Sequence, residues 1–355
     1  ICCPLCRWNQ CGLKQRRKEA NKIILKSIIM DKTNPKVPCA LIFFNRPEPL
    51  AKSFAAIRDY RPDKLFLIQD GARANRLESE SRLIAQCRDV VETVDWPCEV
   101  VKIYSDKNLG CGYRIYSGVK QAFEHVDRLA IIEDDIVCSP AFFEFQEEML
   151  ERYKDESRIH MVSGMNPIGE YKRCPYTYFF SSAGGAIWGW GTWKRVWDAF
   201  DYTLDWYQDS YVRESVFSRC VTPSYRTRLE KYAEAIHVKH TNGISLTAWS
   251  GPFGFTSFLY YRLNIVPRCN LTSNIGLTGD STHATDNPKL VNKKSLQLFN
   301  MQTYLLDDED YRVAMHQHFG TFTYWQRLGG KIENIYRVVR YGGMGYIMKK
   351  LAKRK

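Results

Sequence analysis

The chain has 355 residues, of which 45% are hydrophobic and 14% aromatic, so it can build a sizeable globular core and is not an intrinsically disordered chain. Its formal net charge is +12 at pH 7, and its isoelectric point is near 9.1. A basic surplus of this size favours anionic partners such as nucleic acid, acidic lipid headgroups or phosphorylated substrates, but it does not choose among them.

The N-terminal segment, residues 1–36, precedes the first strongly apolar run. The chain starts at Ile1, and Met30 stands shortly before that run. We therefore expect residues 1–29 to be an upstream extension of the reading frame without a functional role. The cysteines beyond this segment are scattered, several within apolar runs, which is typical of free thiols in a reducing cytoplasm.

Four apolar runs alternate with stretches of helical spacing between residues 37 and 150. Such strand–helix units predict an α/β fold with a doubly wound, mostly parallel sheet and helices on both faces. The strands are expected at residues 38–44, 64–69, 99–104 and 129–132, and the helices at 48–60, 77–94, 112–125 and 142–153. Residues 151–290 form a second half rich in Gly, Trp and Tyr, with a strand at 264–267, and residues 291–355 form a helical basic tail.

Polar residues stand at the carboxyl end of each expected strand. In sheets of this type, ligands bind beyond the carboxyl ends of the strands. The site is therefore expected where these residues meet: Asn45 and Arg46, Gln69 and Asp70, residues 106–108, and Glu133 to Asp135.

Three adjacent carboxylates, Glu133, Asp134 and Asp135, follow the fourth apolar run. They repel one another unless a cation or hydrogen-bond donors satisfy them. A hard divalent ion takes oxygen ligands and can bridge to a diphosphate, so the triplet predicts a metal site. The alternative is a solvated acidic turn.

The other strand ends offer groups suited to a nucleotide. The Arg46 guanidinium can grip a phosphate or a base edge, and Asp70 can accept a hydrogen bond from the imide of a uracil-like base. The glycine-containing run from Asn108 to Arg114 opens a helix, whose N-terminus favours an anion. The alternatives are a surface arginine and a simple Asp-Gly turn.

Tryptophans in the second half are candidates for stacking on the acceptor sugar. An aromatic core is the alternative, and Trp197 is expected to belong to such a core. The candidate acceptor-binding residues are Trp188, Trp190, Trp193 and Trp249.

These residues, in this order, resemble the GT-A glycosyltransferases. The nearer likeness is to bacterial sugar transferases of polysaccharide loci, and a more distant one is to the N-acetylglucosaminyltransferase that starts complex N-glycans. The likeness spans residues 37–290 and rests mainly on the acidic triplet and the Trp-rich stretch. Its segments are ALIFFNRP at 40–47, LIQDG at 67–71, AIIEDDIVCSPAFF at 130–143, WGWGTWKRVW at 188–197, and residues 267–283.

The resemblance assigns roles within the donor site. It implies that Arg46 and Asp70 hold the nucleotide, and that Glu133 and Asp134 hold the ribose and the donor sugar. Residues 37–150 would then be the nucleotide-sugar-binding half, with Asn108 and Arg114 as further donor-binding candidates. The acceptor would bind in the half from 151 to 290.

The same resemblance implies a metal centre. Asp135 would be the direct ligand, and His283 would match a C-terminal histidine near the metal and the diphosphate. A lone histidine is more often structural or exposed. If the imidazole joins the oxygens, Mn²⁺ is favoured over Mg²⁺.

The general base departs from the family pattern. The relatives carry a carboxylate where this chain has Ser250, and a serine hydroxyl is a poor base at neutral pH. Asp280 is the candidate that replaces it, with Glu234 a weaker alternative.

Together these features predict a metal-dependent, inverting transfer of a sugar from a nucleoside-diphosphate sugar, a UDP-sugar being favoured, to a glycan or lipid-linked acceptor. The basic, aromatic tail at 336–355 is expected to contact an anionic membrane from the cytoplasm, or else to be a solvated C-terminus. The alternative functions are a nucleotidyltransferase or other metal-dependent phosphate-transfer enzyme, and a non-catalytic protein that binds anionic ligands. No nucleic acid is expected as a partner.

Overall fold

The first half of the fold is a parallel sheet. The structure is a computed structural model that describes residues 36–183, 185–220, 222–276, 301–302 and 304–318. Its first four strands are β1 (Cys39–Phe43), β2 (Lys64–Gln69), β3 (Glu99–Tyr104) and β4 (Arg128–Glu133). β1 lies between β2 and β4 and is parallel to both, and β3 is parallel to β2 at the edge of the sheet. β1, β2 and β4 are nearly continuous apolar runs because both faces of a parallel sheet are covered, whereas the edge strand β3 is partly exposed.

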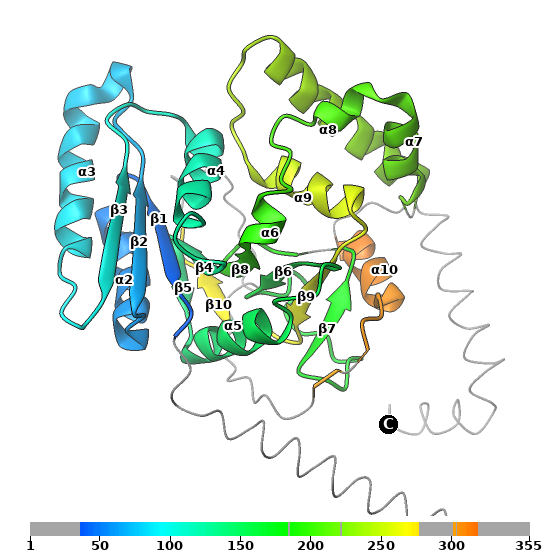
Figure 1. Ribbon diagram of the computed structural model, residues 1–355, viewed down its shortest axis with the longest axis horizontal. Helices are drawn as coiled ribbons and strands as arrows, with labels where there is room; N and C mark the ends of the chain where they lie inside the picture. The colour runs from blue at the N-terminus through cyan, green and yellow to red at the C-terminus, as the bar shows by residue number, and fades with distance from the viewer. Residues whose placement is uncertain (1–35, 184, 221, 277–300, 303, 319–355) are drawn as a thin grey trace, which may run out of the picture. The chain divides into compact units, whose positions relative to one another are not determined.

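Helices cover both faces of these strands. They are α2 (Pro47–Tyr60), α3 (Leu77–Val91), α4 (Cys111–Ala122) and α5 (Pro140–Arg152). α2 packs against α3 and α5, and Figure 1 shows α3 and α4 on opposite sides of the first three strands. β4 joins the sheet on the other side of β1 from β2 and β3, so the order in which strands are added reverses after β3. The connection through α4 therefore crosses the opposite face of the sheet, as a doubly wound fold requires.

The second half of the chain extends the same sheet. Its strands are β5 (Ile136–Cys138), β6 (Ile159–Ser163), β7 (Tyr178–Ser181), β8 (Trp190–Trp193), β9 (Leu263–Pro267) and β10 (Thr272–Asn274). The complete strand order is β3–β2–β1–β4–β8–β6–β9–β7, with a separate pair of β10 and β5. β8 runs antiparallel to β4 and β6, and β7 runs antiparallel to β9. The expected α/β fold with a mostly parallel, helix-flanked sheet is confirmed and is consistent with the GT-A type.

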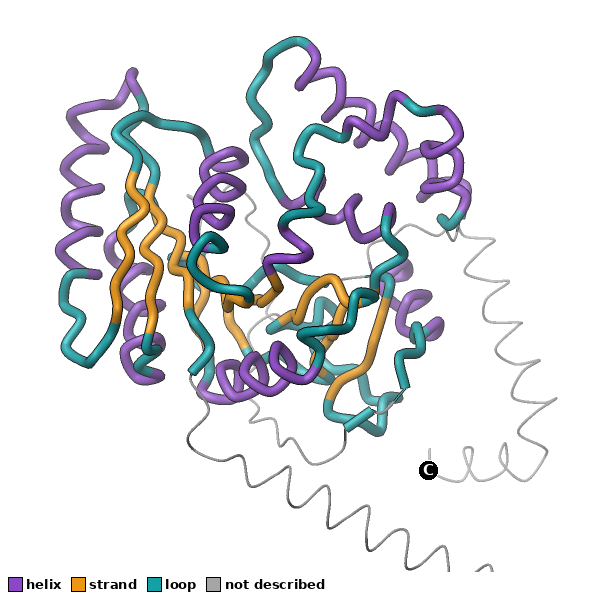
Figure 2. Tube along the Cα trace, in the orientation of Figure 1, coloured by secondary structure: helices purple, strands orange, loops and turns teal. Residues whose placement is uncertain are grey.

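In the part of the second half that the structure describes, the chain forms five further α-helices. They are α6 (Lys194–Trp197), α7 (Ser210–Ser218), α8 (Pro223–Thr241), α9 (Ser250–Leu259) and α10 (Glu309–His318). The purple segments of Figure 2 show α7, α8 and α9 grouped away from the parallel strands. They enclose a small second core made of Leu204, Val216, Phe217, Ala233, Ile236, Leu246 and Phe255. Among the described helices, none is long and apolar enough to cross a bilayer.

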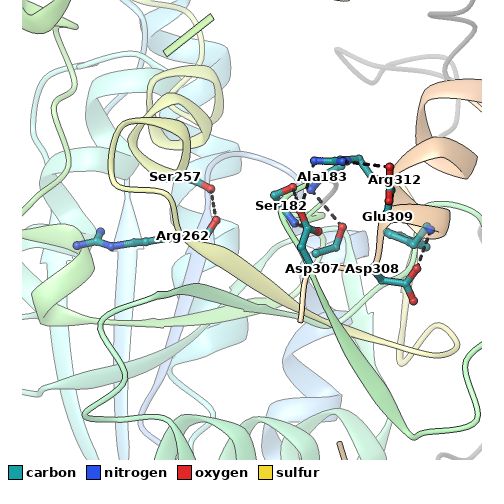
Figure 3. Close-up of polar contacts among 10 residues, drawn as sticks. Ser182, Ala183, Ser257, Arg262, Asp307, Asp308, Glu309 and Arg312 are labelled. Atoms are coloured by element: carbon teal, nitrogen blue, oxygen red, sulfur yellow. Dashed lines mark hydrogen bonds and ion pairs between the residues drawn. The ribbon is translucent and has the colours of Figure 1, made fainter. Parts of the chain in front are cut away.

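Residues 304–318 return to the sheet edge at β7. The Asp307 carboxylate accepts a hydrogen bond from the Ser182 amide at 2.9 Å and pairs with the Arg312 guanidinium at 3.5 Å (Figure 3). The Asp308 amide donates to the carbonyl of Phe180 at 3.0 Å. These contacts fasten the start of α10 to the strand, so the described part of the predicted tail belongs to the fold.

Candidate functional site

The carboxyl ends of β1, β2 and β4 bring the predicted site residues to one edge of the sheet. In the strand register, Ile42 of β1 lies opposite Glu133 of β4, and Phe43 of β1 lies opposite Gln69 of β2. The polar residues after each strand therefore emerge next to one another, as the sequence predicts.

Arg46 and the acidic triplet form the centre of this edge. Pro47 is the first residue of α2, so Arg46 lies in the turn between β1 and α2. Its Nε lies 3.3 Å from Asp134 Oδ2, and its Nη2 lies 3.0 Å from Asp135 Oδ2. The same Nη2 also pairs with Asp134 Oδ1. One guanidinium thus bridges two neighbouring carboxylates.

The triplet is a concentration of poorly solvated negative charge. Desolvation, together with the charges of Asp135 and Asp134, raises the pKa of Glu133 to about 8. Desolvation also raises the pKa of Asp134 to about 6. The Arg46 guanidinium offsets part of this rise, and the negative charge of Asp135 adds to it. Because their raised pKa values show that the ionised forms are disfavoured, a nearby cation would stabilise these carboxylates in the ionised state.

Asp135 is enclosed by the segment that follows β10. Its backbone carbonyl accepts a hydrogen bond from the Ile275 amide at 2.8 Å. A Cβ atom built on Gly276 would lie 2.2 Å from Asp135 Oδ2 and 2.8 Å from its Cβ. Glycine is therefore required here for the carboxylate to keep its position. The sequence contains no signal for this approach, because residues 135 and 276 are brought together by the β5–β10 pairing alone.

We expect Gly276→Ala to displace the Asp135 carboxylate and weaken Mn²⁺ binding roughly 10-fold or more, since misplaced ligands lose affinity steeply. The matched control is Gly254→Ala, because a Cβ at this exposed position of α9 would meet nothing within 4 Å. Mn²⁺ titration followed by electron paramagnetic resonance compares the two variants. Equal affinities would show that the close approach of Gly276 does not govern Asp135.

Asp70 is occupied by backbone amides rather than facing an open base pocket. Its carboxylate accepts hydrogen bonds from the amides of Gly71 at 3.0 Å, Leu109 at 2.9 Å and Gly110 at 2.9 Å. The side chain is buried, and desolvation raises its pKa against these hydrogen bonds. This differs from the expected contact with a nucleobase: in this structure Asp70 holds the loop before α4.

Asn108 and Arg114 also stabilise that loop. The Asn108 side-chain amide donates to the carbonyl of Gly71 at 2.8 Å. Arg114 is buried, and its guanidinium donates to the carbonyl of Ile103 in β3 at 2.9 Å. A guanidinium that is buried and bonded to β3 is not presented to a nucleotide-sugar donor. The expected direct contact of Arg114 with the donor substrate is therefore replaced by a structural contact with β3, beside the loop.

The four candidate tryptophans differ in burial, and Trp188 is the one that is only partly buried against the main core. Trp190, Trp193 and Trp249 are buried, and Trp190 stacks on Trp249 with ring centroids 5.2 Å apart. Buried rings leave no face for a sugar, so these three correct the expectation of acceptor contact and belong to the aromatic core. Trp188 is half-buried, and its carbonyl accepts a hydrogen bond from Thr272 Oγ1 at 2.7 Å beside β10. It remains the acceptor candidate among the four.

Two predicted residues, His283 and Asp280, lie outside the described residues. Ser250 is the first residue of α9, and Glu234 is exposed on α8. Among the described residues, no carboxylate therefore stands at position 250, where the resemblance led us to expect the base.

Two carboxylates of the triplet, Asp134 and Asp135, would supply oxygen ligands to a divalent cation. The Arg46 guanidinium is a stand-in cation, and the two carboxylates that converge on it offer the oxygen ligands that Mg²⁺ and Mn²⁺ take. Within the described ranges, no group of three His, Cys, Asp or Glu side chains is arranged to hold a metal. The remaining positions would fall to water and to a phosphate-bearing ligand, as is usual for Mg²⁺.

Comparisons with known proteins give partial similarities. No protein-family model matches the chain, and no curated protein matches it. HddC from Yersinia pseudotuberculosis has 12% identity and a TM-score of 0.24, covering 36% of this chain and 58% of its own. The inositol-1-phosphate CTP transferase from T. maritima has 10% identity and a TM-score of 0.28, covering 48% and 76%. The glycosyltransferase GlyE of Streptococcus pneumoniae TIGR4 has 8% identity and a TM-score of 0.32, covering 65% and 45%.

This chain thus spans less than two thirds of the length of HddC and of GlyE. Likenesses of this extent leave the function to be argued from the site itself.

Proposed function

We propose that the protein is a metal-dependent glycosyltransferase that takes a nucleoside-diphosphate sugar, a UDP-sugar being favoured, as its donor. The observation that carries this proposal is that Asp134 and Asp135, at the carboxyl end of β4, both contact the Arg46 guanidinium. Ligands bind at this edge of a doubly wound sheet. A diphosphate needs positive charge, which Arg46 would supply together with a divalent ion held by the carboxylates.

The residues of the chain would divide the work between binding and electrostatics. Asp135 would hold the cation, Mn²⁺ being favoured if His283 joins, and the cation would offset negative charge on the departing diphosphate. Arg46 would add a second positive group to the same phosphates. Asp70 and Asn108 would keep the loop before α4 in place, and Glu133 and Asp134 would line the donor site.

The acceptor would be a glycan or lipid-linked saccharide hydroxyl, which Trp188 would contact from the segment beside β10. Asp280 is the proposed base, and a base on the acceptor side implies inversion of the anomeric carbon by single displacement. Contact of residues 336–355 with an anionic membrane, from the cytoplasm, completes this proposal.

A nucleotidyltransferase is the second candidate function. A sheet edge that binds a cation and a nucleotide suits it equally, because phosphoryl and glycosyl transfer both need charge neutralisation at a diphosphate. The two reactions differ in their product, since sugar transfer releases a nucleoside diphosphate and nucleotidyl transfer releases inorganic pyrophosphate.

Release of product from nucleotide sugars tests the proposal. The protein is incubated with UDP-, GDP-, CMP- and dTDP-sugars, with Mn²⁺ or with EDTA, and products are separated by mass spectrometry. We expect release of the nucleoside diphosphate from one donor with Mn²⁺, by slow hydrolysis in the absence of acceptor, and loss of this release with EDTA. Pyrophosphate formed from a sugar phosphate and a nucleoside triphosphate would instead favour the nucleotidyltransferase.

A further inference from the structure

The Arg46 guanidinium is shared unequally between its two carboxylates. Asp134 takes the larger part, with contacts to both Nε and Nη2, whereas Asp135 contacts Nη2 through one oxygen at 3.0 Å. A single nitrogen, Nη2, therefore serves both residues. The second contact can be lost while the first is kept.

Burial makes the Asp134 contact the more difficult one to break. The Asp134 side chain is 5% exposed, and that of Asp135 is 14% exposed. The Asp134 backbone is also held, because the Ser53 hydroxyl donates to its carbonyl at 2.9 Å. Separating Arg46 from Asp134 would leave a buried carboxylate without its partner, which is strongly unfavourable.

The contact between Arg46 and Asp135 is, in contrast, the easier one to break. Arg46 holds this carboxylate through one contact, and Asp135 is the residue at which the proposed function places the cation. A guanidinium and a divalent ion cannot take the same oxygen at close range, because like charges a few ångströms apart repel. A metal that takes Asp135 Oδ2 would therefore compete with Nη2 for that oxygen.

We propose that Arg46 is a resident cation that competes with the divalent ion for Asp135, while Asp134 retains Arg46 in the site as a group for the donor's phosphates. This inference rests on the proposed function and adds a mechanism of coupling to it. Metal alone binds weakly, because it costs the contact between Arg46 and Asp135 and no phosphate replaces that contact. Metal and nucleoside diphosphate bind together well, because the phosphates accept both cations.

Two affinities measured on the full chain test the competition. Mn²⁺ binding without nucleotide is measured by electron paramagnetic resonance, and UDP binding at saturating Mn²⁺ is measured by calorimetry. For Arg46→Met we expect Mn²⁺ affinity to rise about 10-fold and UDP affinity to fall about 10-fold, the scale of one charged contact. A residue with a structural role alone would move both affinities in the same direction.

A matched arginine in α2, the helix that follows Arg46, is the control. Arg58 also pairs with an aspartate, Asp95, but both side chains are half exposed at the other end of α2. Arg58→Met is expected to leave both affinities at the parent values. If Arg46→Met does not fold, the double variant Arg46→Met with Asp134→Asn removes the buried charge along with its partner and leaves Asp135 in place.

The outcomes separate the two proposals. Unchanged or lower Mn²⁺ affinity in Arg46→Met, or in the double variant where that one is needed, overturns the competition and leaves the proposed function standing. Absence of Mn²⁺ and UDP binding in the parent itself overturns the proposed function, and the competition with it. Opposite shifts of the two affinities support both.

Discussion

Replacing Asp135 with alanine is expected to lower metal-dependent turnover of the donor by about 10³-fold, or roughly 4 kcal/mol of transition-state stabilisation. The reason is that the variant loses the carboxylate at which we place the cation, together with the charge that the cation offsets on the departing diphosphate. Product release with the preferred donor measures the loss.

The fold is expected to survive this change. Asp135 adds to the charge that raises the pKa of Glu133 and Asp134, so its removal relieves repulsion within the triplet. The melting temperature without metal should therefore stay at or above the parent value, while the stabilisation by Mn²⁺ should vanish. Asp59→Ala, at an exposed position of α2, is the matched control. Turnover of Asp135→Ala close to that of this control would remove Asp135 from the mechanism.

Replacing Trp190 with alanine is expected to destabilise the protein by about 4 kcal/mol, which is the scale for removing a buried tryptophan. Trp190 is fully buried, and its ring lies 5.2 Å from that of Trp249 and 5.1 Å from that of Phe253. The cavity left by the indole would be lined by aromatic rings that cannot collapse freely. In a domain of this size, the melting temperature should fall by roughly 10 °C.

Trp188→Ala separates packing from acceptor binding. Trp188 is half-buried, so its truncation should cost well under half as much stability as that of Trp190. It should instead raise the KM for the acceptor while leaving hydrolysis of the donor unchanged. If Trp190→Ala kept its melting temperature and lost acceptor affinity, Trp190 would be a binding residue after all.

The parallel half of the fold could be predicted from the sequence because its strands are short, mostly apolar runs joined by local helices. The expected strands at 64–69 and 99–104 match β2 and β3 at both ends. The carboxyl ends of β1 and β4 also predicted where Arg46 and the triplet would meet, since this depends on topology and not on side-chain detail.

In the second half of the fold, the strand expected at 264–267 matches β9 to within one residue, but the other strands were beyond the same reasoning. β8 (Trp190–Trp193) contains aromatic residues and glycine without a clear period, and it pairs with β4 and β6, which are distant in the chain. Composition shows that such residues are apolar but not which strand they join. This is also why stacking tryptophans of the core and a tryptophan for the acceptor could not be told apart.

Within the site, the residue types were predicted better than their contacts. Asp70 was expected to face a base, yet its burial against the loop amides directs it inward. Gly276 was not predicted, because its importance arises from a contact with Asp135 that crosses about 140 residues of chain. Such contacts are tertiary and leave no local pattern.

The location of a bound cation relative to the donor tests the central claim most directly. Crystals soaked with Mn²⁺ and UDP, measured at the manganese absorption edge, would show where the ion lies. The account predicts an anomalous peak in contact with the Asp135 carboxylate and a diphosphate oxygen at the end of β4. A peak elsewhere, or UDP bound at this edge with the Asp135 carboxylate free of metal, would contradict it.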